Sequence, residues 1–138
     1  MRFAYVDTSC LVAIAFDEPG ARRLAVRLSR FGRLLSSNLL EAELRSALLR
    51  EGLAGQGAEL LAGITWVYPD RPLTREFDRI TGAGYLRGAD LWHLACALFL
   101  APDGRDLAFL TLDRRQREVA ERLGFATKDG PRARPGSA

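Results

Sequence analysis

Lysine is almost missing from this chain of 138 residues, since Lys128 is its one lysine beside 19 arginines. A nucleotide-binding P-loop needs the lysine of its GK[ST] motif, and a pyridoxal-phosphate enzyme needs a lysine for its Schiff base. Phosphatases that form an aspartyl-phosphate also usually carry a lysine beside the aspartate. Lys128 follows the last helix that the pattern predicts, so no lysine is available inside the expected fold. The sequence therefore excludes these enzyme classes.

Histidine and cysteine are also scarce. The two cysteines, Cys10 and Cys96, stand far apart within apolar segments, and His93 is the one histidine. This inventory cannot build a zinc site of the Cys/His kind. A Ser-His-Asp triad would have to use His93, which falls within an apolar helical pattern. We therefore expect two reduced, buried cysteines and a histidine that packs or forms hydrogen bonds in the core rather than acting in catalysis.

No apolar run approaches the roughly 20 residues that a membrane crossing requires. The start of the chain does not read as a signal peptide, because few apolar residues follow Arg2 before Asp7 interrupts them. A cytoplasmic protein with no membrane association is therefore the expectation.

The chain has only a small excess of positive charge, with a formal net charge of +3. The segment 128–138 carries three basic residues and one acid, so residues 1–127 hold 17 basic and 16 acidic side chains. This balance is by itself a weak argument for a nucleic-acid partner. With 48% hydrophobic and 27% charged residues, the chain should fold. We expect one domain over residues 1–127 and a flexible basic tail over 128–138.

Short apolar runs alternate with helical patterns along the chain. Thr8 or Ser9 can cap the first helix, and Asn38-x-x-Glu41 resembles a capping box for the third. The pattern predicts strands at 3–6, 33–36, 66–68, 107–110 and 125–127, and helices at 8–16, 21–30, 38–51, 58–64, 74–81, 88–100 and 114–123. Such alternation is typical of an α/β fold, a three-layer α/β/α sandwich with a central, mostly parallel sheet.

Three aspartates stand at unusual positions of this predicted fold. Asp7 and Asp113 each follow a predicted strand, and ligands of such sheets bind beyond the carboxyl ends of the strands. Asp90 shares a helix face with Leu94 and Ala97 in a segment that is apolar almost all round. Asp90 also fits a second interpretation, as an acid at the start of that helix stabilised by the helix dipole.

The helix predicted at 38–51 offers two further acids. Glu41 and Glu43 flank the stripe of Leu40 and Leu44 on opposite sides, so periodicity does not choose between them. Glu41 can pair with Arg45 one turn later, whereas Glu43 has no cationic residue four positions away. We therefore favour Glu43 as the acid that faces the interior.

The candidate acids are thus Asp7, Glu43, Asp90 and Asp113. Unpaired carboxylates that converge repel one another and lose solvation at high cost. A hard divalent cation relieves this cost, and an all-oxygen ligand set suits Mg²⁺ or Mn²⁺. The residues alone therefore suggest a metal-assisted reaction at a phosphate.

Four segments around these acids resemble the four motifs of PIN-domain ribonucleases, in particular the small VapC-type toxins. They are Tyr5-Val6-Asp7-Thr8-Ser9, Glu43-Leu44-Arg45-Ser46-Ala47-Leu48, Leu86-Arg87-Gly88-Ala89-Asp90-Leu91-Trp92-His93-Leu94-Ala95 and Leu110-Thr111-Leu112-Asp113. Their order and spacing match from residue 3 to about residue 127. The resemblance implies a PIN-like fold in which each motif contributes one acid to a metal-binding pocket. Some relatives carry another Asp or Asn after the last acid, where this chain has Arg114, Arg115, Gln116 and Arg117.

The resemblance implies a Mg²⁺- or Mn²⁺-dependent endoribonuclease that leaves a 5′-phosphate and a 3′-hydroxyl. It further implies the toxin of a type II toxin–antitoxin pair, a homodimer that binds RNA and a cognate antitoxin protein. Two alternatives remain: a non-catalytic PIN-like module that binds RNA or protein, and another phosphatase or nuclease on a doubly wound sheet. A DxD start would favour the last, but position 9 is Ser.

Side chains near the motifs have candidate roles beside the acids. Hydroxyls can orient Asp7 or a metal-bound water, although capping a helix or bonding a turn explains them equally well; they are Thr8, Ser9 and Thr111. Arginines can bind RNA phosphates, although a solvated helix surface or a salt bridge is the more ordinary explanation for any one of them; the candidates are Arg45, Arg87, Arg114 and Arg115. Four aromatic residues are expected in the core or at an interface: Trp66, Tyr68, Tyr85 and Trp92.

Overall fold

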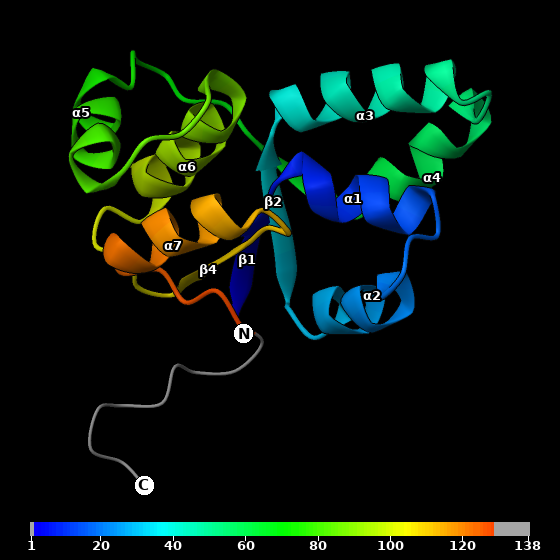
Figure 1. Ribbon diagram of the computed structural model, residues 1–138, viewed down its shortest axis with the longest axis horizontal. Coiled ribbons are helices and arrows are strands. Elements are labelled where there is room, and N and C mark those ends of the chain that lie inside the picture. Colours follow the sequence, from blue (N-terminus) through cyan, green and yellow to red (C-terminus); the bar gives the residue numbers. More distant parts are fainter. Residues whose placement is uncertain (1, 129–138) are drawn as a thin grey trace, which may run out of the picture.

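The computed structural model describes residues 2–128, and at their centre lies a parallel sheet with the strand order β3-β2-β1-β4 (Figure 1). Its strands are β1 (Phe3–Val6), β2 (Arg33–Ser37), β3 (Ile64–Val67) and β4 (Leu107–Leu110). All three strand pairings are parallel, with Tyr5 of β1 opposite Leu35 on one side and Phe109 on the other. All four strands therefore end at the same edge of the sheet.

Helices cover both faces of the sheet and complete the three layers (Figure 1). One face carries α1 (Thr8–Ala15), α2 (Ala21–Ser29), α3 (Asn38–Arg50), the short 3-10 turn η1 (Ala54–Gln56) and α4 (Gly57–Leu61). The other face carries α5 (Thr74–Ala83), α6 (Gly88–Leu100) and α7 (Arg114–Arg122). The expected three-layer α/β/α fold is confirmed.

The alternation of side chains along β1 creates a separate core on each face. Tyr5 packs with Phe109 and the helices α5 to α7, whereas Ala4 and Val6 pack with the helices α1 to α4. Leu40, Leu44 and Leu48 of α3 are spaced one turn apart and are fully buried in the second core. The strand that leads into Asp7 is therefore held between two packed cores.

Helix α6 is buried continuously from His93 to Leu98, as its apolar sequence predicts. It has 13 residues. Within residues 2–128, no helix has the length and apolar character that a membrane crossing requires.

Some local predictions were wrong. Strand β3 begins at Ile64 rather than Trp66, and the 125–127 segment forms only a bridge between Ala108 and Ala126. Asp7 and Ser37, whose extended backbones precede the helical turns, occupy the N-cap positions of α1 and α3. The predicted caps therefore lie inside the helices, and no capping box forms. Of the tail predicted at 128–138, residues 129–138 lie outside the described part.

Candidate active site

Three aspartates occupy the starts of three helices at the carboxyl edge of the sheet. Asp7 follows β1 and is the N-cap of α1, Asp113 follows β4 and is the N-cap of α7, and Asp90 lies in the first turn of α6. The backbone N–H of Asp7 donates to the carbonyl of Leu110, which ties β1 to the end of β4 at 3.2 Å. The positive ends of three helix dipoles thus point toward one group of acids.

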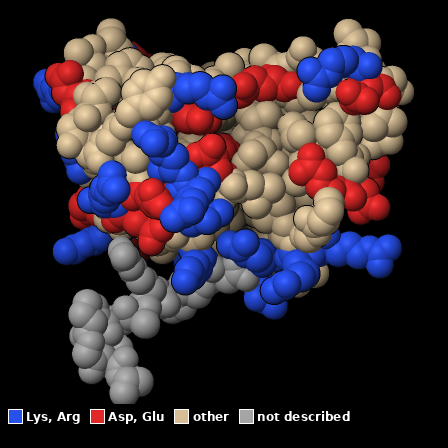
Figure 2. Space-filling model, viewed as in Figure 1, with Lys and Arg blue, Asp and Glu red and all other residues tan. Residues whose placement is uncertain are grey.

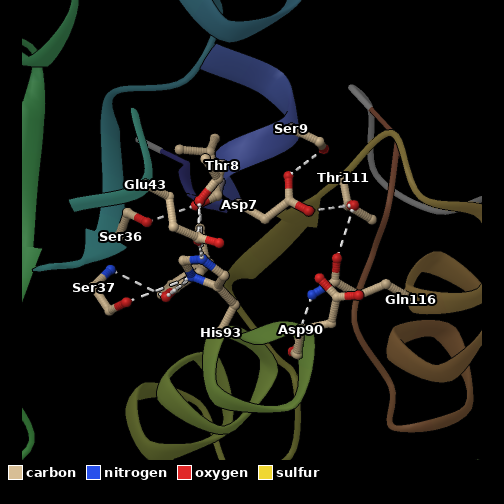
Figure 3. A network of polar contacts seen from close by, with 12 residues as sticks. Asp7, Thr8, Ser9, Ser36, Ser37, Glu43, Asp90, His93, Thr111 and Gln116 are labelled. Carbon is tan, nitrogen blue, oxygen red and sulfur yellow. Dashed lines mark hydrogen bonds and ion pairs between the residues drawn. The ribbon is translucent and has the colours of Figure 1, made fainter. Parts of the chain in front are cut away.

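Asp7 is almost completely buried, with 3% of its surface exposed. Ser9 Oγ donates to its Oδ1 and Thr111 Oγ1 donates to its Oδ2, each at 2.6 Å (Figure 3). Burial raises the pKa of Asp7 above its ordinary value, and the two hydroxyl hydrogen bonds oppose that shift. The two hydroxyls therefore hold the carboxyl plane and favour its charged form.

Asp90 is partly buried and lies within electrostatic range of the other two aspartates. Its pKa is raised first by burial and then by the negative charges of Asp113 and Asp7, while Arg87 and His93 act in the opposite direction. Asp113 accepts a hydrogen bond from the backbone N–H of Gln116 at 2.7 Å. Asp7, Asp90 and Asp113 thus form a loose cluster in which the charges of Asp7 and Asp113 disfavour that of Asp90.

Glu43 joins this cluster from α3 through Thr8 and His93. Thr8 Oγ1 donates to Glu43 Oε1 at 2.7 Å, and His93 Nε2 lies 3.4 Å from the same oxygen (Figure 3). His93 is the main cause that lowers the pKa of Glu43, and its charged form would also lower the pKa of Asp7 and Asp90. His93 is therefore a common neighbour of three of the four acids.

The buried side of His93 fixes its ring. Its Nδ1 lies 2.8 Å from the hydroxyl of Tyr5, and the backbone N–H of Ser37 donates to that hydroxyl at 3.0 Å. The hydroxyl proton of Tyr5 is then available for Nδ1, which places the ring proton of neutral His93 on Nε2, toward Glu43. The histidine is 2% exposed, as expected for a core residue, but it also supports one of the acids.

Glu41 has different partners. Its carboxylate accepts hydrogen bonds from Arg45 and from the side chain of Asn38, both at 2.8 Å, on the surface of α3. The side chain of Glu43 is the more exposed of the two, at 38% against 28%, so its partners rather than its depth distinguish it. The contacts place Glu43 with the aspartates and Glu41 outside that group.

Gln116 is a polar residue of the site that sequence reasoning did not select. It is fully buried, its Oε1 lies 2.9 Å from Thr111 Oγ1, and its Nε2 donates to the backbone carbonyl of Asp90 at 3.1 Å. Its backbone N–H is the donor to Asp113. One residue therefore contacts the segments that carry Asp90 and Asp113 and, through Thr111, reaches Asp7. The available signal was its position on the same face of α7 as the buried Val119 and Ala120.

Comparison with known proteins agrees with this arrangement. Residues 4–122 match the PIN domain family. The chain is also 35% identical over 131 residues to Ribonuclease VapC46 of Mycobacterium tuberculosis (strain ATCC 25618 / H37Rv). The alignment covers 91% of this chain and 96% of that protein. The chain belongs to the PIN-domain family. All four candidate acids lie within the matched part of the PIN domain.

Three of the four candidate arginines of the PIN domain pair with an acid or lie near one. Arg45 pairs with Glu41 and Arg114 pairs with Glu118, in each case one turn away on the same helix. Arg87 is the N-cap of α6 and lowers the pKa of Asp90. Figure 2 shows acidic side chains in the middle of this face, with basic side chains gathered beside them over α7.

Two of the four aromatic residues lie outside the core, so of the expected places only an interface is left for them. Tyr85 is 70% exposed and Tyr68 is 67% exposed. The guanidinium of Arg115 lies 6.0 Å from the centre of the Tyr85 ring. Tyr85 precedes α6 by only a few residues, and a loop of that kind tolerates an exposed ring because no element covers it.

The metal-binding capacity of the PIN domain depends on how closely its acids approach one another. Within residues 2–128, no three His, Cys, Asp or Glu side chains are close enough together to hold one ion jointly. An ion at this edge of the sheet would therefore need ligands besides these carboxyls, such as water.

Proposed function

We propose that this PIN-domain protein is a metal-dependent endoribonuclease, with residues 1–127 as its nuclease domain, and that it is the toxin of a toxin–antitoxin pair of the VapC type. The observation that carries the proposal is the cluster of Asp7, Asp90 and Asp113 at three helix N-termini, in which two neighbouring acids raise the pKa of a third. The chain aligns with nearly the whole length of a relative that is named a ribonuclease, and this supports the choice of RNA as the substrate.

The donor set of the cluster suits Mg²⁺ or Mn²⁺. Carboxylate oxygens are the ligands that these ions prefer, and Mg²⁺ commonly keeps several waters while it engages one or two carboxylates. Such partly hydrated binding agrees with acids that repel one another but do not meet at a point. When bound, the ion supplies charge stabilisation at the phosphate and lowers the pKa of a water molecule.

The residues of the chain orient the reacting groups. Ser9 and Thr111 fix the carboxyl of Asp7, and the first turn of α7 fixes that of Asp113. Backbone N–H groups at the three helix starts favour an anionic phosphate at the same place. Attack of water on phosphorus breaks the bond to the 3′-oxygen, which takes up a proton, and gives a 5′-phosphate and a 3′-hydroxyl, the products that the resemblance to PIN-domain ribonucleases implies.

Cleavage of a labelled single-stranded RNA tests the proposal. The wild-type protein should cleave with Mg²⁺ or Mn²⁺, stop when a chelator is added, and lose activity in Asp7→Asn and Asp90→Asn. Asp103→Asn is the matched control, because Asp103 is exposed and pairs with Arg105 away from the cluster. Cleavage that needs no metal, or that survives both substitutions, contradicts the proposal, and RNA binding without cleavage would favour a non-catalytic module.

The cellular role needs a separate experiment. Expression should arrest growth, and co-expression of the cognate antitoxin protein should relieve the arrest by covering the acids. The Asp90→Asn variant should be harmless and should still bind the antitoxin. Light scattering of the purified protein should show the homodimer that we propose. Arrest by the Asp90→Asn variant would contradict RNA cleavage as the cause of toxicity.

A further inference from the structure

The exposed ring of Tyr85 sits on a segment that is held firmly in place between α5 and α6. Arg122 donates from its guanidinium to the carbonyl of Ala83 at 2.8 Å, which ties the end of α5 to α7. At Gly84 a Cβ atom would lie only 2.8 Å from a methyl group of Val119, so the segment approaches α7 as closely as a glycine allows. Tyr85 therefore projects from a fixed base.

The ring lies against the first turn of α7. The guanidinium of Arg115 lies over it at 6.0 Å, and Arg115 is two residues after Asp113, the N-cap of that helix. Gln116, the next residue of α7, donates from its side chain to the carbonyl of Asp90 in the first turn of α6. The ring thus lies beside the helix start that carries Asp113 and that contacts the segment of Asp90.

We propose that Tyr85 and Arg115 form a nucleobase-binding subsite for single-stranded RNA beside the cleavage site. This inference rests on the proposed ribonuclease function and adds a place for the base next to the reacting phosphate. An exposed aromatic ring offers a base its open face for stacking, and the guanidinium over the ring offers hydrogen bonds to phosphate or a second planar surface.

The chemistry of the subsite predicts how it selects RNA. Stacking accepts every base, so Tyr85 contributes affinity and positions the strand without choosing a sequence. A base can reach the ring only when it is unpaired, so the subsite favours single-stranded over duplex RNA. Loss of the ring should therefore weaken the binding of single-stranded RNAs of different sequence to a similar extent.

Binding of a short RNA that carries 2-aminopurine tests the subsite. The measurement uses the full chain with Asp90→Asn, which slows cleavage, and compares this parent with added Tyr85→Ala, Tyr85→Trp or Tyr68→Ala. Tyr85→Ala should raise Kd about tenfold or more and abolish the quenching of 2-aminopurine, whereas Tyr85→Trp should retain both. Tyr68 is almost equally exposed, so Tyr68→Ala controls for the loss of a surface ring and should bind as the parent does.

The outcomes separate this inference from the function on which it rests. Unchanged Kd and quenching in Tyr85→Ala, or an equal loss in Tyr85→Trp, overturns the subsite even if the wild type cleaves RNA. Equal weakening of duplex RNA also overturns it, because a paired base cannot stack on the ring. Conversely, Tyr85-dependent binding by a wild type that never cleaves RNA refutes the nuclease and leaves the subsite in place.

Discussion

Replacement of Gln116 by methionine tests whether one buried amide holds the acid cluster in shape. Methionine has nearly the same length and no hydrogen-bonding group of comparable strength. The substitution removes the hydrogen bond to the carbonyl of Asp90 at 3.1 Å and the contact with Thr111 at 2.9 Å. It leaves the backbone N–H that donates to Asp113 unchanged.

The cost in stability follows mainly from the hydrogen bond to the carbonyl of Asp90, because the one hydroxyl proton of Thr111 is donated to Asp7. An ordinary hydrogen bond contributes about 0.5–1.5 kcal/mol, so Gln116→Met should lower the free energy of unfolding by about that amount. Thr111 can still donate to Asp7, and the Asp90 carbonyl faces the N–H one turn later in α6, so the lower half of this range is expected. The effect on function should be larger, because a misplacement of about 1 Å can cost about a hundredfold in rate.

Three measurements on the same variant separate positioning from stability. Denaturant unfolding gives the free energy, Mn²⁺ titration followed by electron paramagnetic resonance gives the metal affinity, and RNA cleavage gives kcat and KM. We expect weaker Mn²⁺ binding and a lower kcat with little change in KM. Ile80→Val is the control, because Ile80 is fully buried in the same core and the substitution costs about 0.5–1.5 kcal/mol without touching a polar group. If Gln116→Met binds Mn²⁺ and cleaves RNA as Ile80→Val does, the positioning argument is refuted.

Three further predictions concern single acids and hydroxyls. Asp90→Asn should lower cleavage about a hundredfold or more and yet raise the metal-free stability, because it removes a charge that burial, Asp113 and Asp7 disfavour. Since the pKa of Asp90 is raised by folding, this gain should be absent below about pH 3.9 and should grow as pH rises, and a constant gain in denaturant titrations would contradict it. Thr111→Val should lower kcat about tenfold and Thr111→Ser should restore it, unless the hydroxyl serves only the turn. Glu43→Gln should impair cleavage far more than Glu41→Gln, and equal activities would show that the wrong glutamate had been chosen.

The layers of the fold could be predicted because they depend on burial, which sequence periodicity records directly. The strand at 107–110 and the helix at 88–100 were predicted to the residue, since each is a nearly continuous apolar run. The limits of β3 could not be predicted, because its pairing with β2 extends to Ile64 and pairing depends on the partner strand.

The candidate acids could be proposed from the sequence for a similar reason, but their supports could not. A carboxyl that follows a buried strand or interrupts an apolar helix stands out in the sequence itself. Local pairing rules favoured Glu43 over Glu41 as the acid that faces the interior, yet its side chain is 38% exposed against 28% for Glu41, and only its contacts with Thr8 and His93 link it to the site. The role of Gln116 depends on the carbonyl of Asp90, 26 residues away, and on the hydroxyl of Thr111. Such contacts exist only after α6 and α7 have packed together.

The arrangement also explains how a fold tolerates three buried or half-buried aspartates that repel one another. A cationic side chain bound to each acid would stabilise them but would leave little charge for a metal ion. Here Ser9, Thr111 and the starts of three helices supply neutral donors and partial positive charge instead. Arg45 and Arg114 pair with glutamates of their own helices. In the proposed nuclease, the negative charge of the cluster would therefore stay available to a hydrated cation, while nearby arginines would attract the phosphates of the substrate.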